Sequence, residues 1–183
     1  MKKSLTILTT ITVLILFHKC TYHNSSNNFE SRIHTTQHET DWYTRLGHTD
    51  LEKHINNFNS INWEKDFIDQ FNNDNFNYPD LELFDRDSLF YMSVTVCPDS
   101  LNQFQFCIGA GVHNEVWQED SLIVKRECVI YKTGTSDSKL PIKMIELFYN
   151  RNYYEYTEQL NKMTILFSCE DFYNNLPDSP SIQ

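Results

Sequence analysis

The stretch 88–112 constrains the fold more than any other part of the chain, because it predicts a β-hairpin. Residues 88–96 are rich in β-branched and aromatic side chains, and Pro98 and Asp99 stand at the centre of the type I turn that follows. Between residues 101 and 112 apolar and polar side chains alternate, which is the period-two signature of a half-buried strand. The apolar face consists of Phe104, Phe106, Ile108, Ala110 and Val112. A polar turn at 118–120 and a third expected strand at 122–131 follow. The chain must therefore contain a sheet, and the hairpin makes its local pairing antiparallel.

Two short helices are expected before this hairpin. Apolar residues recur at helical spacing in 49–58, and in 62–71 an aromatic residue recurs every four positions. Asn62 stands where a helix N-cap belongs. We interpret the aromatic stripe of Trp63, Phe67 and Phe71 as core rather than as an exposed recognition surface, because apolar stripes at this spacing usually face the interior.

The order of these patterns predicts the α+β class. Two N-terminal helices would precede a mostly antiparallel sheet of about four strands, joined by one or two further helices. Residues 21–40 are polar and hold too little apolar surface to offset the entropy of ordering them. We therefore expect a signal peptide at 1–19, an anchor cysteine with a flexible tether at 20–40, one globular domain at 41–173 and a flexible tail at 174–183.

The first twenty residues carry an export pattern. Lys2 and Lys3 precede an apolar run at 5–17, which is shorter than a membrane-spanning helix, and Cys20 follows. This segment resembles the signal peptide of bacterial lipoproteins, although Lys19 stands where that family usually has a small residue. The resemblance implies cleavage before Cys20, lipidation of its thiol and anchoring in the cell envelope. An uncleaved anchor or an ordinary secretory signal is the alternative.

Acidic residues outnumber basic ones, which argues against binding to DNA or RNA. The chain has 25 acidic and 15 basic residues, for a formal charge of -10, whereas a phosphate backbone requires clustered Lys and Arg. Cleavage before Cys20 would remove three lysines and leave a charge of -13. Only four glycines are present, which argues against a glycine-rich nucleotide loop. No cofactor is expected.

Four cysteines remain once Cys20 is set aside, and in an exported protein they allow two disulfides with three connectivities. A hairpin centred near residue 118 favours pairing Cys107 with Cys128 and, by elimination, Cys97 with Cys169. The alternative is four buried thiols, since free cysteine is among the most buried residue types.

Few residues suggest a functional site. His113 and Glu115 are weak catalytic candidates, because they stand where the second strand of the sheet is expected to end and histidine transfers protons near neutral pH. An acidic run is a candidate partner surface; it contains Asp80, Glu82, Asp85 and Asp87. His34 and His38 have the spacing of a helical metal pair but lie in the expected tether, so no metal site is predicted.

These features favour an exported lipoprotein with a non-catalytic acidic domain that binds another macromolecule. A sharper form of this hypothesis is an immunity or inhibitor protein whose acidic face meets a basic protein surface. The alternative is a small extracytoplasmic hydrolase or carbohydrate-active enzyme that uses carboxylates, since such chemistry needs no short motif. A structural envelope component that self-associates is a third hypothesis.

Overall fold

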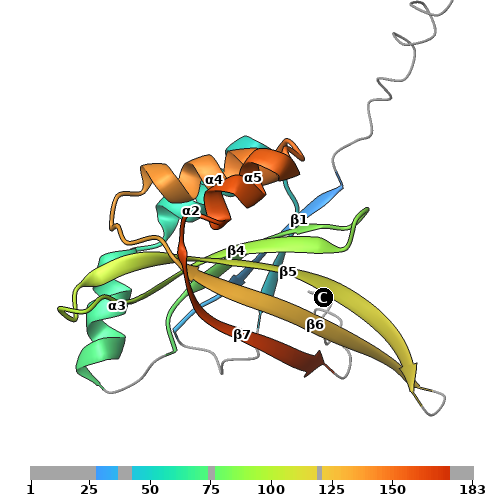
Figure 1. Cartoon of the computed structure of the whole chain (residues 1–183), viewed down its shortest axis with the longest axis horizontal. Helices are drawn as coiled ribbons and strands as arrows, with labels where there is room; N and C mark the ends of the chain where they lie inside the picture. Colours follow the sequence, from blue (N-terminus) through green and yellow to red (C-terminus); the bar gives the residue numbers. More distant parts are fainter. Residues whose placement is uncertain (1–27, 37–42, 74–76, 119–120, 174–183) are drawn as a thin grey trace, which may run out of the picture.

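One antiparallel sheet of seven strands organises the computed structural model of this protein (Figure 1). The structure describes residues 28–36, 43–73, 77–118 and 121–173, with side chains for all of these except 113–118, 121–127 and 169–173. The spatial order of the strands is β2-β1-β3-β4-β5-β6-β7. The strands are β1 (Phe29–His34), β2 (Thr44–His48), β3 (Asp80–Asp85), β4 (Phe90–Pro98), β5 (Phe104–Gln118), β6 (Ser121–Lys132) and β7 (Thr164–Tyr173).

Four described helices pack on the sheet. They are α2 (Leu51–Ser60), α3 (Trp63–Asn72), α4 (Lys139–Tyr149) and α5 (Tyr153–Leu160). α2, α4 and α5 lie together over one face, and α3 lies at one end (Figure 1). No helix in the described ranges is long and apolar enough to cross a membrane.

Local sequence explains where three of these helices begin. Asp50, Asn62 and Asn152 are the N-caps of α2, α3 and α5, and each side chain accepts a hydrogen bond from a backbone N–H in the first turn. Such a cap satisfies one of the N–H groups that the first turn leaves without a partner inside the helix.

The main core lies between the helices and one face of the sheet. Every described helix contributes to it, for example through Phe58, Phe67, Phe148 and Leu160, and the central strands contribute alternate apolar residues. Trp63 and Phe67 are buried in this core, which confirms the interpretation of the aromatic stripe. A helix layer on one sheet face is therefore the basic architecture.

The opposite face of the sheet holds a second, smaller buried cluster. Because side chains alternate along a strand, the neighbours of the core residues point here. The cluster contains Phe84, Tyr91, Cys97, Cys107, Cys128 and Ile130. The edge strand β7 is not covered like the central strands, since its side chains Ile165, Leu166 and Phe167 are exposed.

The expected order of elements is wrong. β1 and β2 precede the helices, and the sheet has seven strands rather than about four. β1 lies in the segment that we expected to be a tether, and it pairs with both β2 and β3. The strand is hard to recognise in the sequence, because Glu30 and Arg32 are charged although they are buried on the face of the sheet opposite the helices.

Ion pairing is what allows those charged residues to be buried. Arg32, which is 3% exposed, contacts Glu30 at 2.8 Å and Glu82 at 3.1 Å, and its guanidinium lies 4.3 Å from the centre of the Phe84 ring. Arg45 and Arg86 also contact Glu30. Burial opposes ionisation of Glu30, yet hydrogen bonds from Arg32 and Arg45 outweigh it and lower the pKa of this carboxyl group.

Candidate functional site

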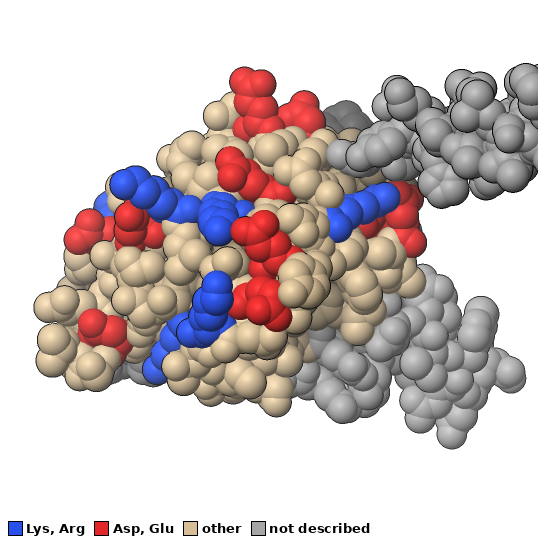
Figure 2. Space-filling model, turned by 45° about the horizontal axis from the view of Figure 1, so that its top comes forward, with Lys and Arg blue, Asp and Glu red and all other residues tan. Residues whose placement is uncertain are grey.

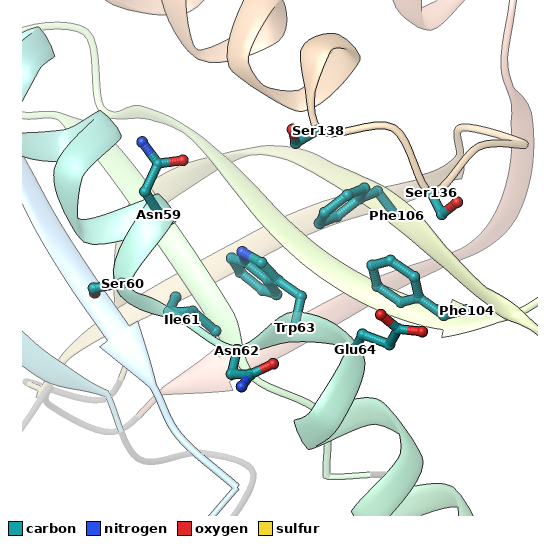
Figure 3. Close-up of a pocket in the computed structure, with 10 residues that line it drawn as sticks. All are labelled: Asn59, Ser60, Ile61, Asn62, Trp63, Glu64, Phe104, Phe106, Ser136 and Ser138. Carbon is teal, nitrogen blue, oxygen red and sulfur yellow. The ribbon is translucent and has the colours of Figure 1, made fainter.

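A groove at the corner between α2 and α3 is the candidate site (Figure 3). Its volume is about 450 Å³, which lies within the range of small ligand pockets. Three separate stretches of the chain line it: Asn59, Ser60, Ile61, Asn62, Trp63 and Glu64 from the helix corner, Phe104 and Phe106 from β5, and Ser136 and Ser138 from the loop before α4. We call this the α2–α3 groove.

The corner itself is fixed by hydrogen bonds. α2 stops because the backbone at Ile61 becomes extended, and Ser60 donates its hydroxyl hydrogen bond to the carbonyl of Asn57 at 2.7 Å. Asn62 then caps α3 by accepting from the backbone N–H of Lys65. The side chains at this corner therefore project from a defined backbone.

Aromatic rings form the floor of the groove. The rings of Phe104 and Phe106 are edge to face with centroids 4.9 Å apart, and Trp63 meets Phe106 at 5.7 Å. The indole N–H of Trp63 donates to the carbonyl of Phe58 at 3.0 Å. Trp63 is only 7% exposed, and its N–H is occupied by the bond to Phe58. The floor is therefore a rigid apolar base, and the polar groups of the groove belong to its walls.

The far wall is a loop that is tied to β5. Phe106 donates its backbone N–H to the carbonyl of Thr135 and accepts from the N–H of Thr133, at 3.0 and 3.1 Å. Gly134 adopts a φ of +71° between them, a backbone conformation that favours glycine. These bonds hold Ser136 and Ser138 at the groove, where the Ser138 hydroxyl makes no capping bond to α4.

A second hollow of about 260 Å³ adjoins the groove along the outer side of α3. It shares Asn62 and Glu64 with the α2–α3 groove and adds Ile68, which is 45% exposed. Lys65 and Asp69 form an ion pair of 2.8 Å on its rim. Together the two hollows make an elongated surface, which suits an extended polypeptide better than a compact small molecule.

Amide and hydroxyl groups dominate the lining of the α2–α3 groove. Glu64 supplies its carboxylate, and the remaining nine lining residues carry no group that titrates near neutral pH. Serine and asparagine side chains both donate and accept hydrogen bonds. The arrangement can bind polar groups over an apolar base, but its lining lacks the second acid or base that carboxylate catalysis uses.

The catalytic candidates lie elsewhere. His113 and Glu115 are within β5, opposite Arg126 and Val124 of β6, and the strand continues to Gln118. The expectation that the second strand of the sheet ends near His113 is therefore wrong. Their side chains are outside the described part of the structure, as are Cys20, His38 and the whole tail at 174–183.

The acidic run is a strand rather than a surface loop. Asp80, Glu82 and Asp85 belong to β3, and Glu82 and Asp85 are both completely buried. Glu82 meets Arg32 on one face of the sheet, whereas Asp85 accepts from Arg151 and Tyr153 on the helix side. Burial is also the main reason why the pKa of Tyr153 rises to about 12.

Asp87 follows β3 in the turn and is paired as well. It accepts hydrogen bonds from Arg151 at 2.6 Å and from Asn28 at 3.1 Å, and the Arg151 bond is the main cause of its lowered pKa. The run therefore offers no block of unpaired acidic charge. On the face shown in Figure 2, basic and acidic side chains are mixed.

The favoured disulfide pairing is also wrong in its register. The β5–β6 hairpin exists, but Cys107 lies opposite Lys132 and Cys128 lies opposite Gly111. The two cysteines are therefore offset by four residues along the paired strands. Cys128 is instead paired through the backbone with Cys169 of β7. Cys97 and Cys107 are free thiols.

Sequence reasoning missed the α2–α3 groove because its parts are far apart in the chain. The helices expected at 49–58 and 62–71 leave residues 59–61 only as a connection, and the alternation at 101–112 marks Phe104 only as a strand residue. The one local signal is the polar pair Asn59-Ser60, and such pairs are common at helix boundaries. The juxtaposition with residues 136–138 depends on the sheet.

Comparisons of this chain with protein-family models, with curated proteins and with solved structures found no match.

Proposed function

We propose that this protein is an exported lipoprotein whose domain binds a segment of another protein through the α2–α3 groove and does not catalyse a reaction. The observation that carries this proposal is the lining of the groove, where amides, hydroxyls and one carboxylate surround a rigid aromatic base. A polypeptide presents the matching groups, namely backbone N–H and C=O groups at regular intervals together with apolar side chains.

The shape of the surface supports a macromolecular partner. The adjoining hollow extends the groove along α3 and brings exposed Ile68 into the same surface. An apolar centre with a polar rim is the usual composition of a protein interface. Export is supported by the segment before Cys20, which resembles a lipoprotein signal.

Glu64 is the only carboxylate among the described residues that line the groove, so the attraction does not depend mainly on charge. We therefore expect binding to persist at high salt, because apolar contacts and shielded hydrogen bonds are screened far less than exposed charges. This replaces the charge-driven form of the hypothesis, whose acidic surface is buried or ion-paired.

Site-specific photocrosslinking in the native cell tests the binding surface. A photoreactive amino acid is introduced in place of Ser60, in place of Ser136, or in place of Leu101 as a control. Leu101 is 73% exposed and lies on the β4–β5 turn outside the groove. We expect one partner to crosslink from both groove positions and not from the control. Equal crosslinking from Leu101, or none from either groove position, would overturn the proposal.

Lipid anchoring is tested separately. The Cys20→Ala variant and the wild-type chain are expressed with a labelled fatty acid, and incorporation into each is compared. We expect label in the wild-type protein only. Unchanged labelling of the variant would refute lipidation at Cys20 without affecting the groove.

A further inference from the structure

Two thiols meet on the face of the sheet that is opposite the helices. Cys97 is on β4 and Cys107 is on β5, and they are diagonal neighbours, because Cys97 is paired with Gln105 and Cys107 with Thr95. Their side chains are hydrogen-bonded to each other. Both belong to the smaller buried cluster, with Cys97 7% exposed and Cys107 completely buried.

The backbone around the two thiols is held in place. Gln105 lies directly opposite Cys97, and its amide donates to the carbonyl of Pro98 at 3.1 Å and accepts from the N–H of Gly134 at 3.2 Å. This side chain therefore joins β4, β5 and the loop after β6. Since the strands cannot slide past each other while these bonds persist, the two sulfur atoms remain neighbours.

Different surroundings give the thiols different reactivities. The hydrogen bond from Cys107 lowers the pKa of Cys97, with a further contribution from the positive charge of Lys132. The same hydrogen bond and burial raise the pKa of Cys107. Thiolates attack disulfides and thiols do not, so Cys97, which is also the more exposed, is suited to react first.

We propose that Cys97 and Cys107 are a redox pair that forms an intramolecular disulfide by exchange with an external disulfide. The Cys97 thiolate attacks one sulfur of the oxidant, and the oxidant releases one thiolate. The Cys107 thiol then loses its proton and attacks the Cys97 sulfur, so that the second oxidant thiolate leaves. One protein disulfide forms, two electrons pass to the oxidant, and its disulfide becomes two thiols.

The site is distinct from the α2–α3 groove and does not depend on the proposed function. It also replaces the pairings expected from the sequence, since the strand register separates Cys107 from Cys128. The cell envelope is an oxidising compartment, so an exported chain would meet suitable oxidants there.

Trypsin provides a direct assay, because residues 87–125 contain no internal Lys or Arg and hold Cys97 and Cys107 but no other cysteine. The reduced full-length protein is incubated with oxidised glutathione, quenched in acid, alkylated under denaturing conditions and digested. We expect this peptide to be lighter by two hydrogen atoms and to carry no alkyl group. A peptide with two alkyl groups, a stable glutathione adduct, or a crosslink to the peptide holding Cys128 would overturn the proposal.

Variants test the order of the two steps. In Cys107→Ser we expect glutathione to accumulate on Cys97, since no second thiol displaces it. In Cys97→Ser we expect Cys107 to remain unmodified, because it is inaccessible. Cys128→Ser is the matched control and should form the same product as the wild type. Glutathione on Cys107 in the Cys97→Ser variant would refute the order of attack, and the wild-type peptide alone decides whether the disulfide forms.

Discussion

His54 should make the stability of this protein depend on pH. Its side chain, on α2, is completely buried, and its Nδ1 is 2.5 Å from the hydroxyl oxygen of Ser31 on β1. Its Nε2 is buried without a hydrogen-bond partner in the described structure. Burial removes the water that would stabilise the charged ring, and this lowers the pKa of His54 from 6.5 to about 3.

The direction of this pH dependence follows from the number of protons that each state binds. Between pH 6.5 and 3 the unfolded chain protonates this histidine and the folded chain does not, so acid favours unfolding. The contribution of His54 is complete above pH 6.5 and is lost as the pH falls. With 1.36 kcal/mol for each pKa unit, the whole effect is about 5 kcal/mol, of which about 2 kcal/mol is lost between pH 7 and pH 5.

Urea unfolding of the wild type and of His54→Asn at both pH values measures this term, since asparagine does not titrate. Other ionisable groups affect both proteins alike and cancel in the comparison. We expect the wild type to lose about 2 kcal/mol more than the variant on going from pH 7 to pH 5. His48→Asn is the control, because His48 is exposed on β2, and it should behave as the wild type does. The same pH dependence in wild type and His54→Asn would refute the reasoning.

Two further predictions concern the face of the sheet opposite the helices. Arg32→Met should lower the free energy of unfolding by about 3–5 kcal/mol, because it leaves two buried carboxylates without their shared cation. Lys65→Met breaks only a solvent-exposed pair and should have a much smaller effect. Urea titration at pH 7 compares the two variants, and equal losses would contradict this account. Gly109→Ala should destabilise by about 1–3 kcal/mol, since the added methyl group would collide with the Ser93 hydroxyl. Combining it with Ser93→Gly should recover part of the loss in the same assay, and no recovery would place the clash elsewhere.

Local periodicity was enough to predict some elements and not others. The helix at 62–71 was predicted within one residue of α3, because an aromatic stripe and an asparagine cap are both local signals. The hairpin at 88–112, which is the β4–β5 pair, was predicted for the same reason, although β5 is longer than expected. Where side chains alternate and a polar turn follows, the sequence itself specifies the pairing.

β1 and β3 were not predicted because charged residues are buried on their face opposite the helices. In the sequence alone, these residues resemble solvent-exposed ones. On the adjacent strands β1 and β3, however, the guanidinium of Arg32 forms ion pairs with the carboxylates of both Glu30 and Glu82. That pairing joins residues 50 positions apart, so no short window of sequence contains it. The α2–α3 groove escaped prediction for the same physical reason, since the sheet alone brings residues 59–64, 104–106 and 136–138 together.

The early start of β1 limits how far the domain can stand from a membrane. Only eight residues separate Cys20 from Phe29, and even a fully extended chain of that length spans about 30 Å. A lipid on Cys20 would therefore keep the near end of the domain within about 30 Å of the membrane surface, which is about the thickness of the hydrocarbon core. A partner embedded in the same membrane would then need to project only a short distance from the bilayer to reach the domain.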